Sequence, residues 1–269
     1  MFEPFFDQYL PSITFNGGKP VYVPLHPPKD SIKNQKSNDW TIDIQELRYV
    51  ILCKGVSTYL NVGRLAITPR TKMIIVNTPH NPVGKVFTKP ELEAIAAIAE
   101  EFNLLVMADE VVRPKFFPLP KTLYIYLDQY DCLVFDGMEH IRIANLPGMW
   151  DRTITVGSAG SKHTSSLGTV ILNLHFTEAF AATGWRIGWL IAPACYIRPT
   201  LAASTRIVFC TNSPLQEAAA AGLEQAKEKR FFETQLAEYQ ERRTILTDAF
   251  DKLGLKYSLP QGTYFILLV

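Results

Sequence analysis

Two short apolar runs, each followed by polar residues, constrain the fold of this chain more than any other feature. Met73–Val76 has the length and composition of a buried strand, and it leads into Asn77–Gly84, a turn rich in Asn, Pro and Gly. Residues 104–108 form a second apolar run, and Asp109 follows it directly. In an open α/β sheet, ligands bind at the carboxyl ends of the strands. The pattern therefore predicts a binding site where these two strands end.

The residues between the two runs have the pattern of an amphipathic helix. Thr88 and Glu91 have the spacing of a capping box, in which the two side chains bind backbone N–H groups that a helix start leaves free. The apolar residues that follow recur at helical spacing and predict one buried face: Leu92, Ile95, Ala96, Ala99 and Phe102. Strand, helix and strand together predict a β-α-β unit.

The composition favours a globular protein without a strongly charged partner. Of the 269 residues, 47% are apolar and 12% are aromatic, and the formal net charge is +1. This balance gives no reason to expect nucleic acid or a membrane as a partner, and no apolar run is long enough to span a bilayer. The N-terminus does not have the pattern of a signal peptide. The scattered cysteines have no metal-ligand spacing and indicate reduced thiols in an intracellular protein, cytoplasmic or mitochondrial: Cys53, Cys132, Cys195 and Cys210.

The order of the predicted elements changes at about residue 200. Before it, strands and helices alternate, with further strands at Arg152–Gly157 and Ile187–Ile191, and this favours a mostly parallel sheet between helices. After it, Ser213 reads as a helix cap, and helical periodicity continues to Leu253. Gly254 is the expected stop. The predicted stripe on this helix is Phe232, Leu236, Tyr239, Arg243, Leu246, Phe250 and Leu253.

The last residues, Thr263–Val269, have the composition of a strand. We expect this strand to lack a partner, which suggests that the chain is truncated.

Four motifs occur in the order typical of one enzyme family. They are Asn77–Gly84, Asp109, Gly157–Gly160 and Ala182–Trp189, and together they resemble the fold-type I pyridoxal phosphate (PLP) aminotransferases of class I/II. Two further runs, Glu3–Tyr9 and Tyr130–Gly137, resemble the kynurenine/glutamine aminotransferase branch. The resemblance implies an α/β fold: a PLP-transferase large domain over residues 1–205, then the start of a smaller α+β domain at 206–269.

The resemblance also implies a role for each polar residue of these motifs. Asp109 would accept the pyridinium N–H of the cofactor and keep the ring protonated, although alone it would read as an Asp that caps the following turn. Asn81 and Tyr130 would donate to the phenolic oxygen, whereas an ordinary turn residue is the other interpretation of Asn81. Ser158 and Arg186 would bind the phosphate, for which a guanidinium is well suited.

Phe6 is the candidate for stacking on the cofactor ring, and a buried core residue is the other interpretation.

The Schiff-base lysine of the family is out of register in this chain. The family places it directly after the Ser-Ala-Gly run and at a fixed distance before Trp185, and these two counts lead to Ser161 and Glu178. Lys162 lies one residue from the first position, so it is the only candidate and a poor one, because catalytic geometry tolerates a shift of about 1 Å.

Three segments interrupt runs that otherwise match the family: 49–63, 112–129 and 161–178. We hypothesise that they are retained introns, translated in frame, from a eukaryote with short introns. The codons of Ser161–His163 can hide a splice donor, and joining Gly160 to Ala179 across the third segment can restore a lysine codon. The alternative is three genuine loop insertions, which protein surfaces tolerate.

The activity implied by the resemblance is transamination between an aromatic or sulfur-containing amino acid, kynurenine among them, and a 2-oxo acid. The family also implies a homodimer. A cysteine-conjugate β-lyase shares the fold and cofactor, and a non-catalytic pseudoenzyme or gene-model fragment would explain the displaced lysine. From the resemblance, we expect the family's N-terminal phosphate-binding loop to lie before residue 1 and the arginine that binds the substrate carboxylate to lie after residue 269.

Overall fold

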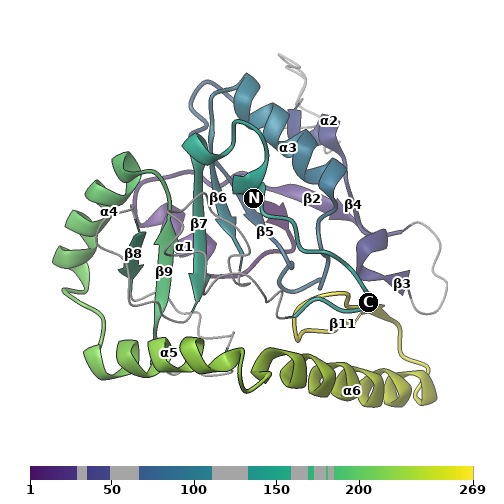
Figure 1. Cartoon of the computed structure of the whole chain (residues 1–269). Helices are drawn as coiled ribbons and strands as arrows, with labels where there is room; N and C mark the ends of the chain where they lie inside the picture. Colours follow the sequence, from purple (N-terminus) through teal and green to yellow (C-terminus); the bar gives the residue numbers. More distant parts are fainter. Residues whose placement is uncertain are drawn as a thin grey trace, which may run out of the picture.

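A five-stranded sheet forms the centre of the molecule (Figure 1). The computed structural model describes residues 1–28, 35–48, 67–110, 133–158, 169–172, 180 and 185–268. The strand order is β5-β6-β7-β9-β8, with β5 (Met73–Asn77), β6 (Leu105–Asp109), β7 (Thr153–Ser158), β8 (Thr169–Leu172) and β9 (Gly188–Ile191). The first three strands in this order are parallel, whereas β9 is antiparallel to both of its neighbours. The predicted mostly parallel arrangement is thus confirmed for β5, β6 and β7.

Successive residues of a strand face opposite sides of the sheet, and each face of the central sheet packs against a helix. In β6, Val106 and Ala108 belong to the main core, which includes the buried residues of α3 (Lys89–Glu101). Met107 instead packs against a second core cluster that contains Ile197 of α4 (Ala194–Ile207). Two adjacent residues at the end of β6 therefore project into different environments.

Two small sheets flank the central one. The first has the order β1-β2-β4, with β1 (Phe2–Glu3), β2 (Val23–His26) and β4 (Thr41–Ile42), and the second has the order β11-β10-β3, with β3 (Gln35–Lys36), β10 (Tyr257–Leu259) and β11 (Leu267–Leu268). The remaining short elements of this part are α1 (Tyr9–Thr14), α2 (Ile44–Arg48) and the 3-10 turns η1 (Ser37–Asp39), η3 (Ile143–Asn145) and η4 (Trp150–Arg152).

Helix α3 begins as the sequence predicts. Thr88 is its N-cap, and the capping box with Glu91 is present. Of the predicted buried face, Phe102 is wrong: it is the C-cap residue, and 40% of its surface is exposed. The helix ends there, so the periodicity that would bury this ring no longer applies.

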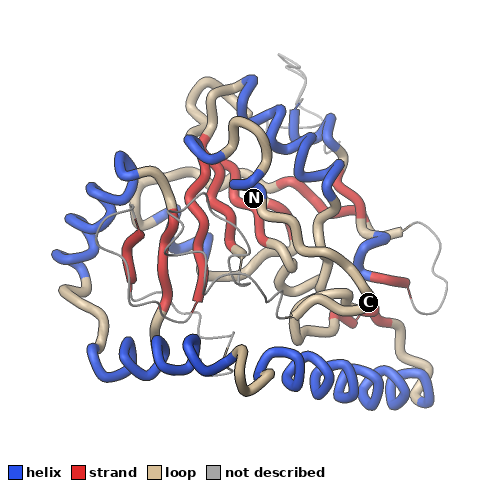
Figure 2. Tube along the Cα trace, in the orientation of Figure 1, coloured by secondary structure: helices blue, strands red, loops and turns tan. Residues whose placement is uncertain are grey.

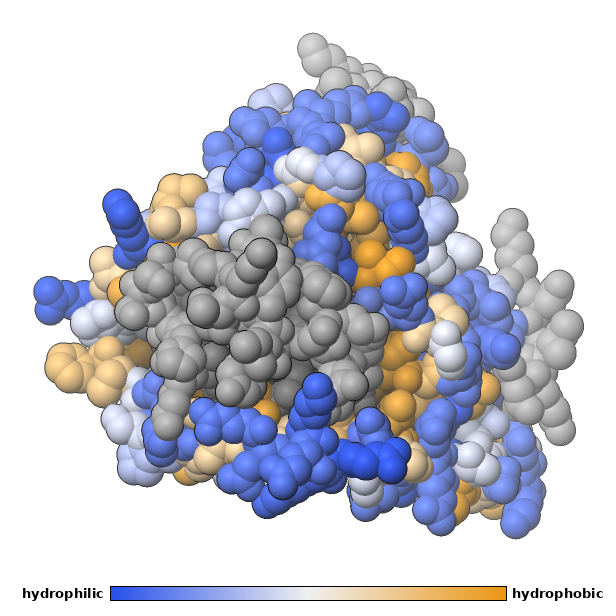
Figure 3. Space-filling view, viewed as in Figure 1, coloured by the Kyte–Doolittle hydropathy of each residue, from blue (hydrophilic) through white to orange (hydrophobic). Residues whose placement is uncertain are grey.

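The predicted continuous helix after residue 213 is two helices, α5 (Ser213–Ala226) and α6 (Phe231–Lys252). They run end to end along one edge of the molecule (Figures 1 and 2), and this edge is largely hydrophilic (Figure 3). The break lies at Arg230, whose φ of 48° is left-handed and cannot continue a right-handed helix. The cap of α5 is Asn212, whose side chain accepts a hydrogen bond from Leu215 N at 3.2 Å, rather than the predicted Ser213.

The predicted stripe on α6 is only partly buried. Phe232 is buried, whereas Leu246 and Leu253 are 49% and 72% exposed. Arg243 forms an ion pair with Asp136 at 2.6 Å rather than an apolar contact. A helix packed along only part of its length exposes the rest of its apolar residues, and sequence periodicity does not show how far the packing extends.

The prediction of an unpartnered last strand is wrong. Leu267–Leu268 forms β11, which pairs antiparallel with β10. The chain between these strands also reaches the segment before η3, since Val134 forms an isolated bridge with Gly262. The chain thus returns from α6 to pack on the body of the molecule.

The predicted interruptions fall largely outside the described residues. Segments 49–63 and 112–129 lie outside them, and of 161–178 only β8 is described. Strand β8 forms the edge of the central sheet beside β9. The predicted domain boundary after residue 205 falls in the last turn of α4, which ends at Ile207.

Candidate active site

The polar motifs meet at one edge of the central sheet. Asn77 is paired with Asp109 across β5 and β6, and Asp109 is paired in turn with Val156 of β7. Strand β9 is antiparallel, so it begins where β7 ends, and Ser158 is paired with Gly188. The carboxyl ends of three strands and the start of a fourth therefore share this edge.

The Asp109 carboxylate is buried and bound by a tyrosine from the N-terminal helix. Only 2% of Asp109 is exposed, and the Tyr9 hydroxyl at the start of α1 donates a hydrogen bond to its Oδ2. Tyr9 is itself 7% exposed. A hydrogen bond to a carboxylate favours the ionised form and restricts its orientation. Sequence analysis did not identify Tyr9, because its partner lies 100 positions away in the chain.

Asn77 connects the carboxylate strand to the polar turn. Its Nδ2 donates to the Asp109 carbonyl oxygen at 3.0 Å, and its Oδ1 accepts from the Asn81 backbone N–H at 2.7 Å. Asn77 is 5% exposed; the bond to Asp109 is buried, and the bond to Asn81 is partly buried. The side chain therefore sets the position of Asn81 relative to Asp109. The sequence does hold a signal for this role of Asn77: it is an amide side chain at the end of a predicted strand, four residues before Asn81.

Arg186 lies at the same edge as the end of β7. It lies two residues before the start of β9, and its φ of 59° is left-handed, a conformation that residues other than glycine adopt rarely. Burial lowers the pKa of Arg186 from its ordinary value. Ser158 ends β7 and is paired with the first residue of β9.

The other predicted site residues are placed as follows. Phe6 is half-buried, and its ring meets that of Tyr9 edge to face, with 5.6 Å between the centroids. Tyr130 and Lys162 lie outside the described residues. The structure thus brings together the elements that carry Phe6, Asn81, Asp109, Ser158 and Arg186.

Glu110 follows Asp109 but faces the opposite side of the sheet. It is fully buried, its Oε1 accepts from Ile143 N at 3.2 Å, and its Oε2 lies 3.5 Å from Nη1 of Arg142. Burial raises the pKa of Glu110 to about 7, and Asp109 adds to this rise, whereas Arg142 and the Ile143 N–H oppose it. Glu110 is therefore part of the core rather than of the strand-end site.

We expect Glu110→Gln to change the pH dependence of stability in one direction. The folded pKa of about 7 lies above the ordinary 4.5, so folding binds a proton between these values, and Glu110 lowers stability as the pH rises through them. The unfolding free energy of Glu110→Gln minus that of the wild type should rise by about 1 kcal/mol per pH unit in this range. Urea unfolding from pH 4.5 to 7.5 measures it, and a constant difference would contradict it.

His80 also makes stability depend on pH in the same urea unfolding experiment, with the opposite sign. Burial lowers the pKa of His80 to about 3, with the Lys85 charge adding to the shift. The folded state therefore keeps this ring neutral while the unfolded state binds a proton below pH 6.5, so stability should fall as the pH decreases from 6.5 towards 3. This effect is common to both proteins and cancels in the difference.

Two other classes of site have no support in the described part of the chain. Within it, no group of three or more His, Cys, Asp or Glu residues is placed to hold a metal ion. Among the same residues, no helix combines the length and apolar character that crossing a bilayer requires.

Comparison with known proteins agrees with this geometry. The family model "Aminotransferase class I and II" matches residues 1–112 and 170–269. A probable kynurenine–oxoglutarate transaminase of Saccharomyces cerevisiae is 39% identical over 271 residues, which cover 100% of this chain and 49% of that protein. The kynurenine–oxoglutarate transaminase of Dictyostelium discoideum is 36% identical over 274 residues, which cover 99% of this chain and 51% of that protein. The chain thus spans about half the length of these relatives.

A solved structure shows the same fold. Bna3p from Saccharomyces cerevisiae superposes with a TM-score of 0.74 and 38% identity, over 99% of this chain and 51% of that one. The chain belongs to the class I and II aminotransferase family.

Proposed function

We propose that this protein catalyses PLP-dependent transamination between an aromatic or sulfur-containing amino acid, with kynurenine as the first substrate to test, and a 2-oxo acid. The observation that carries the proposal is the buried Asp109 carboxylate at the end of β6, bound by Tyr9 and joined through Asn77 to the turn of Asn81. The names of the relatives support the choice of kynurenine and 2-oxoglutarate as substrates.

The chemistry of the donor set fits PLP. The edge holds a buried carboxylate for a ring N–H, an amide-bearing turn for a phenolic oxygen, and a guanidinium for a phosphate. When bound, the cofactor supplies a protonated ring that withdraws electrons from the α-carbon of the amino acid. Asp109 would hold the proton on the ring nitrogen, and the Tyr9 hydroxyl, which donates to its Oδ2, would orient the carboxylate.

The remaining residues bind and orient. Asn81 and Tyr130 donate to the phenolic oxygen, and Phe6 covers one face of the ring. Ser158 and Arg186 would bind the phosphate, for which the planar guanidinium of Arg186 offers paired N–H donors. We also propose that the protein forms a homodimer, as the resemblance to the family implies.

The catalytic lysine would be restored if the segment 161–178 is a retained intron, and we propose the same origin for 49–63 and 112–129. The match to the family model is interrupted between residues 112 and 170, a gap that contains most of the second segment and part of the third, whereas it runs through the first segment. In the chain as written, Lys162 is the lysine nearest to the family position, one residue out of register. The displaced lysine also favours a second candidate, a non-catalytic protein of the same fold.

The first experiment is to sequence the cDNA across residues 46–66, 109–131 and 157–187. We expect spliced reads that join Gly160 to Ala179 through one lysine codon. The protein expressed from that cDNA, with PLP, kynurenine and 2-oxoglutarate, should form glutamate at a rate that depends on added PLP. Pyruvate and ammonia from a cysteine conjugate, without glutamate, would instead identify a β-lyase. Reads that keep all three segments, and no binding of PLP, would support the non-catalytic protein.

A further inference from the structure

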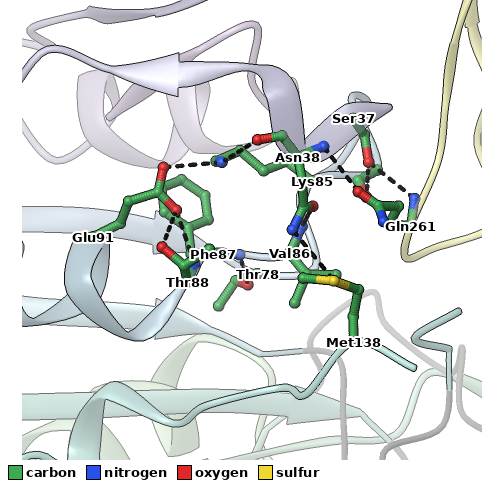
Figure 4. Close-up of polar contacts among 11 residues, drawn as sticks. Ser37, Asn38, Thr78, Lys85, Val86, Phe87, Thr88, Glu91, Met138 and Gln261 are labelled. Carbon is green, nitrogen blue, oxygen red and sulfur yellow. Dashed lines mark hydrogen bonds and ion pairs between the residues drawn. The ribbon is translucent and has the colours of Figure 1, made fainter. Parts of the chain in front are cut away.

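The turn that carries Asn81 is fastened at its base by a buried lysine (Figure 4). Lys85 is 1% exposed, and its Nζ lies 2.9 Å from Oε1 of Glu91 and 3.4 Å from the carbonyl oxygen of Asn38. The ring of Phe87 lies 5.5 Å from the ammonium. An ammonium in this position loses its hydration, so its two oxygen partners and the ring face replace water.

Glu91 joins this lysine to the start of α3. Its Oε2 accepts from the N–H and the hydroxyl of Thr88, both at 2.8 Å, while its Oε1 pairs with Lys85. One carboxylate therefore caps the helix and holds the lysine. Movement of the turn relative to α3 would break the ion pair.

The backbone on either side of Lys85 is held as well. Val86 N donates to Oδ1 of Asn38 at 2.9 Å. Asn38 of η1 therefore contacts residues 85 and 86 through both its side chain and its carbonyl oxygen. The carbonyl oxygen of Gly84 accepts three hydrogen bonds, from Ser37 Oγ at 2.7 Å, Gln261 N at 3.1 Å and Gly262 N at 2.9 Å. Two separate parts of the chain, η1 and residues 261–262, therefore meet at residues 84–86.

The same residues close the turn around Asn81. His80 N donates to the Lys85 carbonyl oxygen, and Gly84 N donates to the His80 carbonyl oxygen, both at 2.7 Å. Asn81 lies at the tip of this closed turn, and its own N–H is bound by Asn77. The position of the tip thus depends on the anchoring of its base.

We propose that Lys85 is a positioning residue for Asn81, acting through the backbone of the turn. The inference rests on the proposed function, since Asn81 matters only if it contacts the cofactor. Lys85 is enclosed by Glu91, Asn38 and Phe87, so it acts on the site only through the turn. It also makes the orientation of Asn81 depend on η1 and on the chain that follows β10.

The test uses the double variant Lys85→Met/Glu91→Gln in the full chain. Lys85→Met alone would leave the Glu91 carboxylate without its partner and destabilise the fold generally. Glutamine at position 91 keeps an acceptor for Thr88, so the helix cap survives. The matched control is Lys89→Met/Glu93→Gln, which removes an exposed ion pair of 3.7 Å on the same helix.

Hydrogen exchange is the first readout, and it needs no cofactor. We expect the Asn81 and Gly84 amides to exchange about tenfold faster in the double variant, while the amides of β5 and β6 are unchanged. The control variant should match the wild type at all of these positions. Equal acceleration throughout the sheet, or none in the turn, would show a merely structural lysine and overturn the inference.

Cofactor affinity is the second readout, with PLP and with its analogue that lacks the phenolic oxygen as probes. The double variant should weaken PLP binding about tenfold and leave binding of the analogue unchanged. Adding Asn81→Ala to it should cause no further loss, because both changes remove the same hydrogen bond. If Asn81→Ala itself has no effect, the proposed role of Asn81 fails, and the inference fails with it. If only Asn81→Ala weakens binding, the inference alone is overturned.

Discussion

In the protein expressed from the spliced cDNA, replacing Asp109 with asparagine is expected to lower kcat/KM for transamination by about a thousandfold, the size of effect seen when an enzyme loses one buried electrostatic stabiliser. Asparagine has nearly the same shape and is neutral, so it no longer favours a protonated ring nitrogen. The buried position excludes water as a substitute, since only 2% of Asp109 is exposed. Steady-state kinetics with kynurenine and 2-oxoglutarate, together with the absorption spectrum of the bound cofactor, measure the effect.

The matched control for this variant is Asp151→Asn. Asp151 is exposed in η4, at the amino end of β7 and therefore at the opposite edge of the sheet. Its replacement should change neither the rate nor the spectrum. If Asp109→Asn retains the wild-type rate and spectrum, Asp109 does not contact the cofactor, and the proposed function loses its main support.

Replacing Gly84 with alanine is expected to lower the free energy of unfolding by about 3 kcal/mol. Its φ of +79° is left-handed, which costs an alanine about 1 kcal/mol or somewhat more. A Cβ at this position would also lie 2.4 Å from Cβ and 2.8 Å from Cα of Pro260, so the turn and the chain after β10 must separate. Overpacking of this kind adds about 2 kcal/mol. Urea unfolding midpoints measure the loss.

Gly254→Ala isolates the backbone contribution to this loss. Gly254 has nearly the same φ, +69°, but nothing lies within 4 Å of a Cβ built there. It should lower the unfolding free energy by only about 1 kcal/mol. Equal losses in the two variants would mean that the contact with Pro260 contributes nothing.

The elements that sequence analysis located correctly depend on interactions within a few residues. The Thr88–Glu91 capping box and the left-handed glycine that ends α6 are local hydrogen-bond and backbone preferences, so they can be recognised in any chain. The helix cap of α5 was predicted wrongly because local preferences did not distinguish two neighbouring residues, and packing decided between them. Asn212 and Ser213 are both good caps, and only the path of the chain into α5 decided between them.

The long-range contacts of the site were not predictable in the same way. Tyr9 and Asp109 lie 100 positions apart, and Lys85 and Asn38 lie 47 apart. No periodicity or spacing relates such residues, because their encounter depends on how whole elements pack. The same holds for β10, whose parallel pairing with β3 places Ser258 opposite Gln35.

The sequence by itself determined the β-α-β unit, the carboxylate after its second strand and the family, because strand length, helix caps and turn residues act locally and recur in order. Only the tertiary structure decided which side chains hold that carboxylate and anchor the turn beside it. Tyr9, Asn77 and Lys85 acquire their partners when the N-terminal helix, the sheet and the chain after β10 pack together. Because these side chains are buried, water cannot replace their partners, and leaving any of them unpaired would be costly.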